Sequence, residues 1–223
     1  EELEKKLLPR GLIYSGSADL ERVRLALAAA FATLPREEVR AISAAEPHIG
    51  RETVQYVEDA MDVTQGKLGM GFSCGSDDMP ALLMGNTLFG GSSNSKLFLN
   101  VREKLSLCYY ASSLYHRQKG LITVSSGIEF QNYQRAYDEI MAQMEAVQKG
   151  ELEDWELEGA RSTLLNSYAT IGDSQGKLEN FYLGQAATGR SEMPEELAQA
   201  VSDMTAERIC RAMETVRLGT VYF

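Results

Sequence analysis

The stretch LFGGSSNSKLFLNVREKLSLCYYAS, residues 88–112, predicts a helix, a turn, a second helix and a strand in close succession. Gly90 and Gly91 end the first helix, because glycine adopts the left-handed conformation with which helices commonly close. The four residues 92–95, Ser-Ser-Asn-Ser, then offer N-cap side chains for the second helix. That helix carries apolar residues over 97–105, and a strand opens at residues 107–109. The stretch therefore places a helix end directly beside a strand start.

Further elements extend from this stretch in both directions. On its carboxyl side, residues 107–115 and 121–128 read as the strands of a hairpin, and Gly120 suits a positive φ in the connection. The other expected strands are at 12–14, 53–60, 67–74 and 220–223, with a turn at 62–66. The other expected helices run from Asp19 to Pro35, from Asp78, at 132–150 with Asn132 as N-cap, and at 152–169, 176–187, 195–203 and 206–216.

The order of these elements favours an α+β fold with a mainly antiparallel sheet, because strands and helices are partly segregated along the chain. We find no internal repeat, no low-complexity segment and no evident linker. The sequence therefore predicts a single domain over residues 1–223.

Composition bounds the classes of function. Apolar residues make up 44% of the chain and charged residues 24%, values that are ordinary for a soluble globular domain. No apolar run is long enough to cross a bilayer. The net charge of -10 argues against nucleic acid and anionic membrane as partners, whereas a basic peptide is compatible with it. An acidic surface that serves only solubility is the alternative interpretation.

The cysteines and the amino terminus indicate the compartment and the origin of the chain. Cys74, Cys108 and Cys210 are odd in number and widely spaced, so reduced thiols in a cytoplasmic protein are expected, with Cys108 in core packing. No apolar signal region follows the charged start at Glu1. Because the sequence lacks an initiator Met, we expect it to be a piece of a longer protein.

Several kinds of chemistry are absent from the sequence. The two histidines, His48 and His116, cannot form a paired zinc motif and are expected in exposed loops. The segment 71–75, Gly-Phe-Ser-Cys-Gly, does not match the Gly-x-Ser-x-Gly nucleophile elbow. The Gly-Ser turn at 88–95 lacks the Lys-Ser/Thr of a phosphate-binding loop. The sequence therefore predicts neither a metal site nor a cofactor site in this chain.

Arg102 and Tyr109 are the candidate site residues. Arg102 lies in the last turn of the expected helix, and Tyr109 opens the strand seven residues later, so the reversal can bring both side chains to one sheet edge. A guanidinium and a phenol at that place could donate hydrogen bonds to a carbonyl oxygen. The residues alone leave a structural alternative open, in which Arg102 complements the helix dipole and Tyr109 is a half-buried strand residue.

This stretch resembles the second domain of insulinase- and pitrilysin-type zinc peptidases, the inverzincins. The likeness rests on the Gly-rich turn, the Arg-Glu-Lys helix end at 102–104 and the strand start at 107–109. It extends to the opening unit 12–35 and to the Lys-Gly-Glu-Leu junction at 149–152. Cys108 stands where the family often has Gly, and Tyr110 adds a second aromatic residue.

The resemblance implies a two-layer half-unit with helices on one face of the sheet. It implies that two such halves enclose a peptide, that one half binds zinc, and that Arg102 and Tyr109 of the other half bind the peptide backbone and stabilise the oxyanion. The expected partners are therefore a zinc-bearing half-domain or paired subunit and a peptide substrate, and this chain alone is expected to be inactive. Two alternatives remain: a structural or peptide-binding pseudoenzyme, and an unrelated α+β domain that binds a small molecule.

Overall fold

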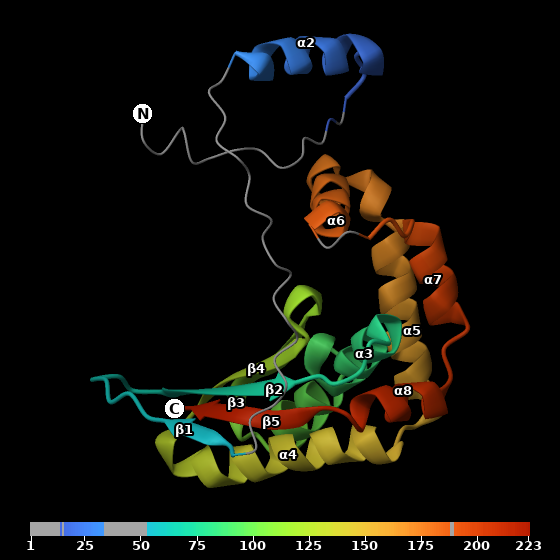
Figure 1. The fold of residues 1–223 in the computed structure, drawn as a ribbon. Helices are drawn as coiled ribbons and strands as arrows, with labels where there is room; N and C mark the ends of the chain where they lie inside the picture. The colour runs from blue at the N-terminus through green and yellow to red at the C-terminus, as the bar shows by residue number, and fades with distance from the viewer. Residues whose placement is uncertain (1–13, 15, 34–52, 188–189) are drawn as a thin grey trace. The chain divides into compact units, whose positions relative to one another are not determined.

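The structure is a computed structural model that describes residues 14, 16–33, 53–187 and 190–223 (Figure 1). The chain forms two compact units, which are described separately. The described residues of the first unit come from Glu1–Ala44 and Thr170–Met193, and those of the second from Ala45–Ala169 and Pro194–Phe223. The single domain over residues 1–223 stays a prediction.

The described residues of the first unit form three helical segments. They are α2 (Leu20–Ala32), the 3₁₀ turn η5 (Ile171–Asp173) and α6 (Gln175–Ala187). Asp19 is the N-cap of α2, as expected, because its carboxylate accepts a hydrogen bond from the Arg22 backbone N–H at 2.8 Å. Tyr14 is not in a strand; residues 12 and 13 of the expected first strand, together with Pro35 and His48, lie outside the described residues.

The second unit is built on a five-stranded sheet with the order β1-β5-β2-β4-β3. Every neighbouring pair is antiparallel except β1 and β5. The strands are β1 (Gln55–Val57), β2 (Gly66–Ser73), β3 (Cys108–His116), β4 (Leu121–Ile128) and β5 (Arg217–Tyr222). The mainly antiparallel sheet of an α+β fold is confirmed.

One expectation about the sheet is wrong. Residues 62–66 do not form a turn between neighbouring strands, because β5 lies between β1 and β2. Strand β1 pairs in parallel with β5 from the carboxyl end of the chain, with Tyr56 opposite Val221. Apolar alternation identifies a strand but does not name its partner, so this distant pairing was not visible in the sequence.

Side chains of alternate strand residues are buried on one face of the sheet. Leu68 and Phe72 of β2 and Ile122 of β4 have no exposed surface, whereas Lys67 and Ser125 on the opposite face are exposed. The helical segments of this unit are α3 (Met79–Asn86), η1 (Thr87–Gly91), η2 (Leu97–Lys104), η3 (Arg117–Lys119), η4 (Phe130–Asn132), α4 (Tyr133–Lys149), α5 (Asp154–Ala169), α7 (Pro194–Ser202) and α8 (Ala206–Met213).

The ends of several helices and turns follow the expected chemistry. Asp78 caps α3 by accepting from the Ala81 backbone N–H. Gly120 in the β3–β4 connection and Gly150 after α4 have positive φ values of 58° and 73°. Asn132 precedes α4 but makes no side-chain capping bond. Within the described residues, no helix has both the length and the apolar content that crossing a membrane requires.

The two helical segments of the quoted stretch differ from ordinary α-helices. Both η1 and η2 are π-helical, a wider winding that occurs often at functional sites. Residue counting by a period of 3.6 places their residues in helices correctly but cannot predict this winding. Arg102 lies in η2, so the π turn sets the direction from which its side chain leaves the backbone.

A buried ion pair fixes the start of η2. Lys96 Nζ lies 3.0 and 2.9 Å from the two carboxylate oxygens of Glu156 in α5, and the side chains are only 9% and 7% exposed. Glu156 also accepts from the Glu153 backbone N–H at 2.9 Å. These bonds hold the residue before η2 against the first turn of α5.

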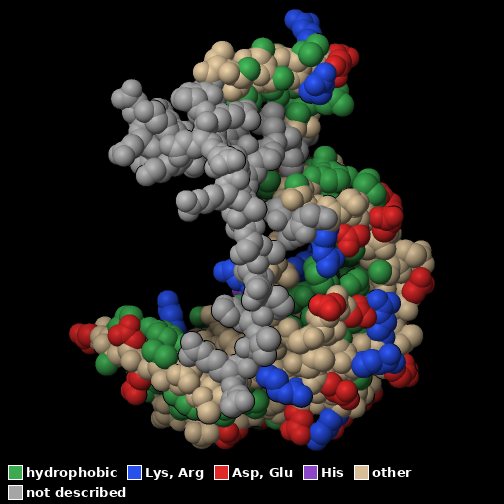
Figure 2. Space-filling model, in the orientation of Figure 1, with side chains coloured by type: hydrophobic (Ala, Val, Ile, Leu, Met, Phe, Trp, Pro, Cys, Tyr) green, Lys and Arg blue, Asp and Glu red, His purple; other side chains and the backbone are tan. Residues whose placement is uncertain are grey.

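Charged side chains are mixed over the helices of the second unit. Figure 2 shows Lys and Arg side chains interspersed with Asp and Glu on the face that it presents. The charge there does not gather into one basic stripe of the kind that tracks a nucleic-acid backbone.

Candidate functional site

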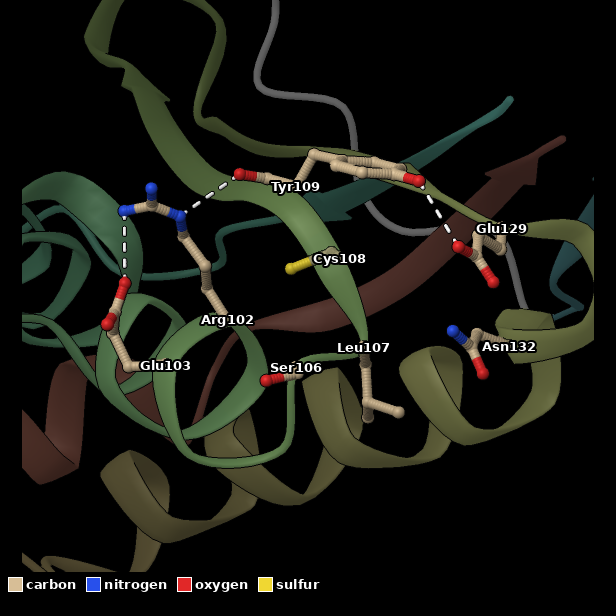
Figure 3. A pocket seen from close by; sticks show the side chains of 8 residues that line it. All are labelled: Arg102, Glu103, Ser106, Leu107, Cys108, Tyr109, Glu129 and Asn132. Atoms are coloured by element: carbon tan, nitrogen blue, oxygen red, sulfur yellow. Dashed lines mark hydrogen bonds and ion pairs between the residues drawn. The ribbon is translucent and has the colours of Figure 1, made fainter. Parts of the chain in front are cut away.

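Arg102 and Tyr109 line one hollow at the edge of the sheet (Figure 3). Its volume is about 420 Å³. The other lining residues are Glu103, Ser106, Leu107, Cys108, Glu129 and Asn132. The helix end of η2, the start of β3 and the end of β4 thus meet around one space.

The reversal from η2 to β3 is closed by backbone bonds. Ser106 has a φ of 50°, in the left-handed region, and its N–H donates to the Arg102 carbonyl at 3.1 Å. The Leu107 N–H donates to the Val101 carbonyl at 3.0 Å, and the Leu107 side chain is buried. This short, well-bonded turn explains how residues seven positions apart come to line the same hollow.

The Arg102 guanidinium is held by three neighbours. Its Nε donates to the backbone carbonyl of Tyr109 at 3.0 Å, and its Nη1 lies 3.2 Å from a Glu103 carboxylate oxygen. The guanidinium carbon also lies 4.7 Å from the centroid of the Phe98 ring, within cation–π range. Among the described residues, Nη2 has no hydrogen-bond partner, so this donor is available to a ligand.

Tyr109 occupies an irregular position in the hairpin. The register pairs Cys108 with Ile128 and Tyr110 with Gly127, so Tyr109 is the extra residue of a bulge. Its side chain is exposed, and its hydroxyl donates to a Glu129 carboxylate oxygen at 3.2 Å. Figure 3 shows the ring extending away from the Arg102 guanidinium toward Glu129.

A second hollow lies beside the first. It measures about 450 Å³ and shares Tyr109 and Glu129 with the first hollow; its other lining residues are Thr64, Gln65, Phe130 and Gln131. The hydrogen bond to Glu129 and the charge of that carboxylate raise the pKa of Tyr109, and the hydrogen bond with Gln65 lowers it in part. Tyr109 and Glu129 therefore stand between two spaces and act on each other electrostatically.

The structure brings the two predicted site residues together but does not bond their head groups. Arg102 reaches Tyr109 only through the backbone carbonyl, while the phenol pairs with Glu129. Sequence reasoning missed Glu129. A signal was present, because Glu129 directly follows β4 and Tyr109 lies at the start of the strand that pairs with β4.

The other candidate nucleophiles and ligands serve the core or the sheet. Burial raises the pKa of the Cys74 thiol to about 12, and burial also raises the pKa of Cys108. His116 is half-buried at the end of β3, with Nε2 at 3.0 Å from Thr123 Oγ1, so the expectation of an exposed loop residue is wrong. Strand β3 runs one residue beyond its predicted end at Tyr115, and it takes His116 into the ladder opposite Leu121.

Zinc ligands are not assembled in the described part of the chain. There, no group of three or more His, Cys, Asp or Glu side chains is placed to hold a metal ion. The described histidine is bonded to a threonine hydroxyl rather than grouped with carboxylates. The donor set around Arg102 and Tyr109 therefore does not fit zinc, and no chemical step of this chain is derived through a metal.

Comparisons with known proteins agree with this arrangement. Residues 12–164 match the model of a family described as the peptidase M16 inactive domain. The sequence is 37% identical over 215 residues to the probable inactive metalloprotease YmfF of Bacillus subtilis, covering 93% of this chain and 49% of that protein. The chain thus spans about half the length of this curated relative.

Solved structures share the fold. A conserved protein from Enterococcus faecalis V583 superposes with a TM-score of 0.80 at 27% identity, over 92% of this chain and 49% of that one. A protease from Helicobacter pylori gives 0.77 at 16% identity, over 92% and 52% of the two chains. A peptidase M16 inactive domain from Pseudomonas fluorescens gives 0.75 at 17% identity, over 92% and 51%. At these two lower identities the likeness concerns the fold alone.

Proposed function

The chain belongs to the family of peptidase M16 inactive domains, and from this premise we propose that it is the zinc-free half of a zinc-dependent peptidase, where Arg102 and Tyr109 hold the peptide backbone. The observation that carries the proposal is their placement on one hollow, with the guanidinium restrained by three neighbours. The family membership supports a non-catalytic half of insulinase type.

Arg102 has the chemistry that peptide hydrolysis requires from such a half. Negative charge develops on the carbonyl oxygen in the transition state, and a preplaced donor stabilises it more than it stabilises the substrate. The Arg102 side chain is 40% exposed, so a ligand can reach it, and its planar guanidinium is already oriented. Because little reorientation is needed, most of the interaction energy is available to the reaction.

A zinc-bearing half is the partner that this proposal requires. Zinc supplies a nucleophilic water and polarises the carbonyl when it is bound in such a half. That half would lie elsewhere in a longer protein, since the chain spans about half of its curated relative, or in a paired subunit. The net charge of -10 is compatible with basic peptides as substrates.

A second candidate function is a pseudoenzyme that binds peptide or organises a complex without cleaving. The name of the Bacillus subtilis relative, a probable inactive metalloprotease, favours it. Both functions use the same hollow, and they differ in whether any assembled form hydrolyses peptides.

Metal analysis with an activity assay separates these functions. We expect the purified chain to hold no stoichiometric zinc after dialysis and to leave peptides intact, because its described residues assemble no ligand set. The same chain joined to or paired with a zinc-bearing half is expected to cleave peptides with one zinc per pair. One tightly held zinc in the isolated chain would contradict the proposal, and an assembled form with zinc but without hydrolysis would favour the pseudoenzyme.

A further inference from the structure

The hydrogen bond between Tyr109 and Glu129 has a fixed direction. A carboxylate oxygen accepts hydrogen bonds, and in this bond the Tyr109 O–H donates to one Glu129 carboxylate oxygen at 3.2 Å. A phenol carries one such proton. The Tyr109 oxygen, which also takes part in a hydrogen bond with Gln65, therefore presents a remaining lone pair, and not an O–H, to a molecule in the adjoining hollows.

Glu129 is held in the position that this bond requires. Its other carboxylate oxygen accepts from Gln131 Nε2 at 2.7 Å, and its backbone carbonyl accepts from the Asn132 N–H at 2.9 Å. It directly follows Ile128, which ends β4 and has no exposed surface. The acceptor is thus fixed by a side-chain bond, a backbone turn and a buried strand end.

Arg102 and Tyr109 consequently offer opposite polarities. Arg102 keeps an available N–H donor at Nη2, and Tyr109 offers an oxygen acceptor. The first hollow also carries two carboxylates, Glu103 and Glu129, against one guanidinium. An extended peptide presents both C=O acceptors and N–H donors along its backbone, so it can satisfy both groups at once.

We propose that Glu129 is a positioning residue that fixes the Tyr109 phenol as a hydrogen-bond acceptor for an N–H group of the bound peptide, while Arg102 serves the peptide carbonyl. The inference rests on the proposed function and changes the role of Tyr109 within it. The N–H group belongs to the peptide backbone or to a free amino terminus, since both are donors with the same chemistry.

The first arm of the test measures the titration of the Tyr109 phenol. The chain is labelled with ¹³Cζ-tyrosine, and the Tyr109 signal among the ten tyrosines is identified by its loss in Tyr109→Phe. Glu129→Gln keeps the side-chain size but removes the charge, so the titration midpoint of Tyr109 is expected to fall toward the ordinary phenol pKa. A midpoint that does not move would overturn the inference. Tyr110→Phe is the matched control, because that phenol pairs with the neutral Ser125 hydroxyl.

The second arm measures peptide binding to the intact chain and asks whether Tyr109 accepts a hydrogen bond from a peptide N–H. The probe is a dansylated peptide of alanines flanked by lysines, together with analogues in which one backbone amide is replaced by an ester. The ester removes a single N–H donor, and losing one neutral hydrogen bond weakens binding roughly twofold to tenfold. We expect one ester position to weaken binding by about fivefold, and this penalty should vanish in Tyr109→Phe and shrink in Glu129→Gln.

Free and acetylated amino termini distinguish the two sources of the donor. A penalty from an internal ester identifies a backbone N–H, and a penalty from acetylation alone identifies the terminal amine; either result supports the inference if Tyr109→Phe abolishes it. Peptide binding that depends on Tyr109 but not on any N–H would overturn the inference and leave the proposed function intact. If the wild-type chain binds none of the peptides, the proposed function fails and the inference fails with it.

Discussion

Lysine in place of Arg102 is expected to lower turnover about a hundred- to a thousandfold in the form that carries a zinc-bearing half. Lysine keeps the positive charge but loses the planar fork, so it cannot hold both the Tyr109 carbonyl and Glu103 while it presents a donor to the substrate. The thermal midpoint should change little, because an exposed cation at a helix end contributes only about 0.3–1 kcal/mol to stability. Turnover and thermal midpoint are measured on the same preparation.

An arginine away from the hollow provides the control for this substitution. Arg135 is exposed on α4, and Arg135→Lys is expected to leave both turnover and midpoint unchanged. If Arg102→Lys keeps turnover within about twofold of the wild type while the midpoint falls by several degrees, Arg102 is a structural residue.

The Tyr109→Phe variant in the same turnover assay should lower turnover by at most about tenfold if the phenol accepts a hydrogen bond from a peptide N–H.

Removing the carboxylate of Glu156 is expected to destabilise the chain by about 3–5 kcal/mol. The Glu156→Ala variant leaves the Lys96 ammonium buried without its partner, and a lone buried charge is far less stable than a paired one. For a chain of this size the thermal midpoint should fall by roughly 6–20 °C. Urea unfolding monitored by circular dichroism gives the change in the free energy of unfolding.

An exposed ion pair in the same unit is the matched control. Lys149 lies 2.6 Å from Glu145 on α4, but their side chains are 58% and 60% exposed, so solvent screens the pair and Glu145→Ala should lower stability far less than Glu156→Ala does. Replacing Lys96 and Glu156 together with Met and Leu should recover much of the lost stability, because it leaves no unpaired charge. A loss in Glu156→Ala no larger than in Glu145→Ala would refute the role of the buried pair.

Local signals made much of the fold predictable. The Asp19 and Asp78 caps, the positive φ of Gly120 and the closure of α4 by Gly150 all depend on residues within a few positions of each other. Residue type and spacing are therefore enough to predict these caps and turns. The hairpin of β3 and β4 was predictable for the same reason.

Contacts between distant segments were not predictable in this way. The parallel pairing of β1 with β5 and the bond of Lys96 to Glu156 join residues that nothing in their local sequence connects. The candidate site shows the same division. The spacing of Arg102 and Tyr109 predicted that both residues lie at one edge of the sheet. The bulge that turns Tyr109 toward Glu129 depends on strand register, which one sequence does not reveal.

Mapping where a bound peptide touches the chain tests the central claim most directly. A peptide carrying a benzophenone side chain is irradiated with the chain, and the cross-linked residues are identified by mass spectrometry, with excess unlabelled peptide as competitor. We predict competable cross-links at the residues that line the two hollows, which lie within 64–65, 102–109 and 129–132. Cross-links confined to other surfaces, such as the exposed side of α4, would contradict the assignment of this hollow as the peptide-binding site.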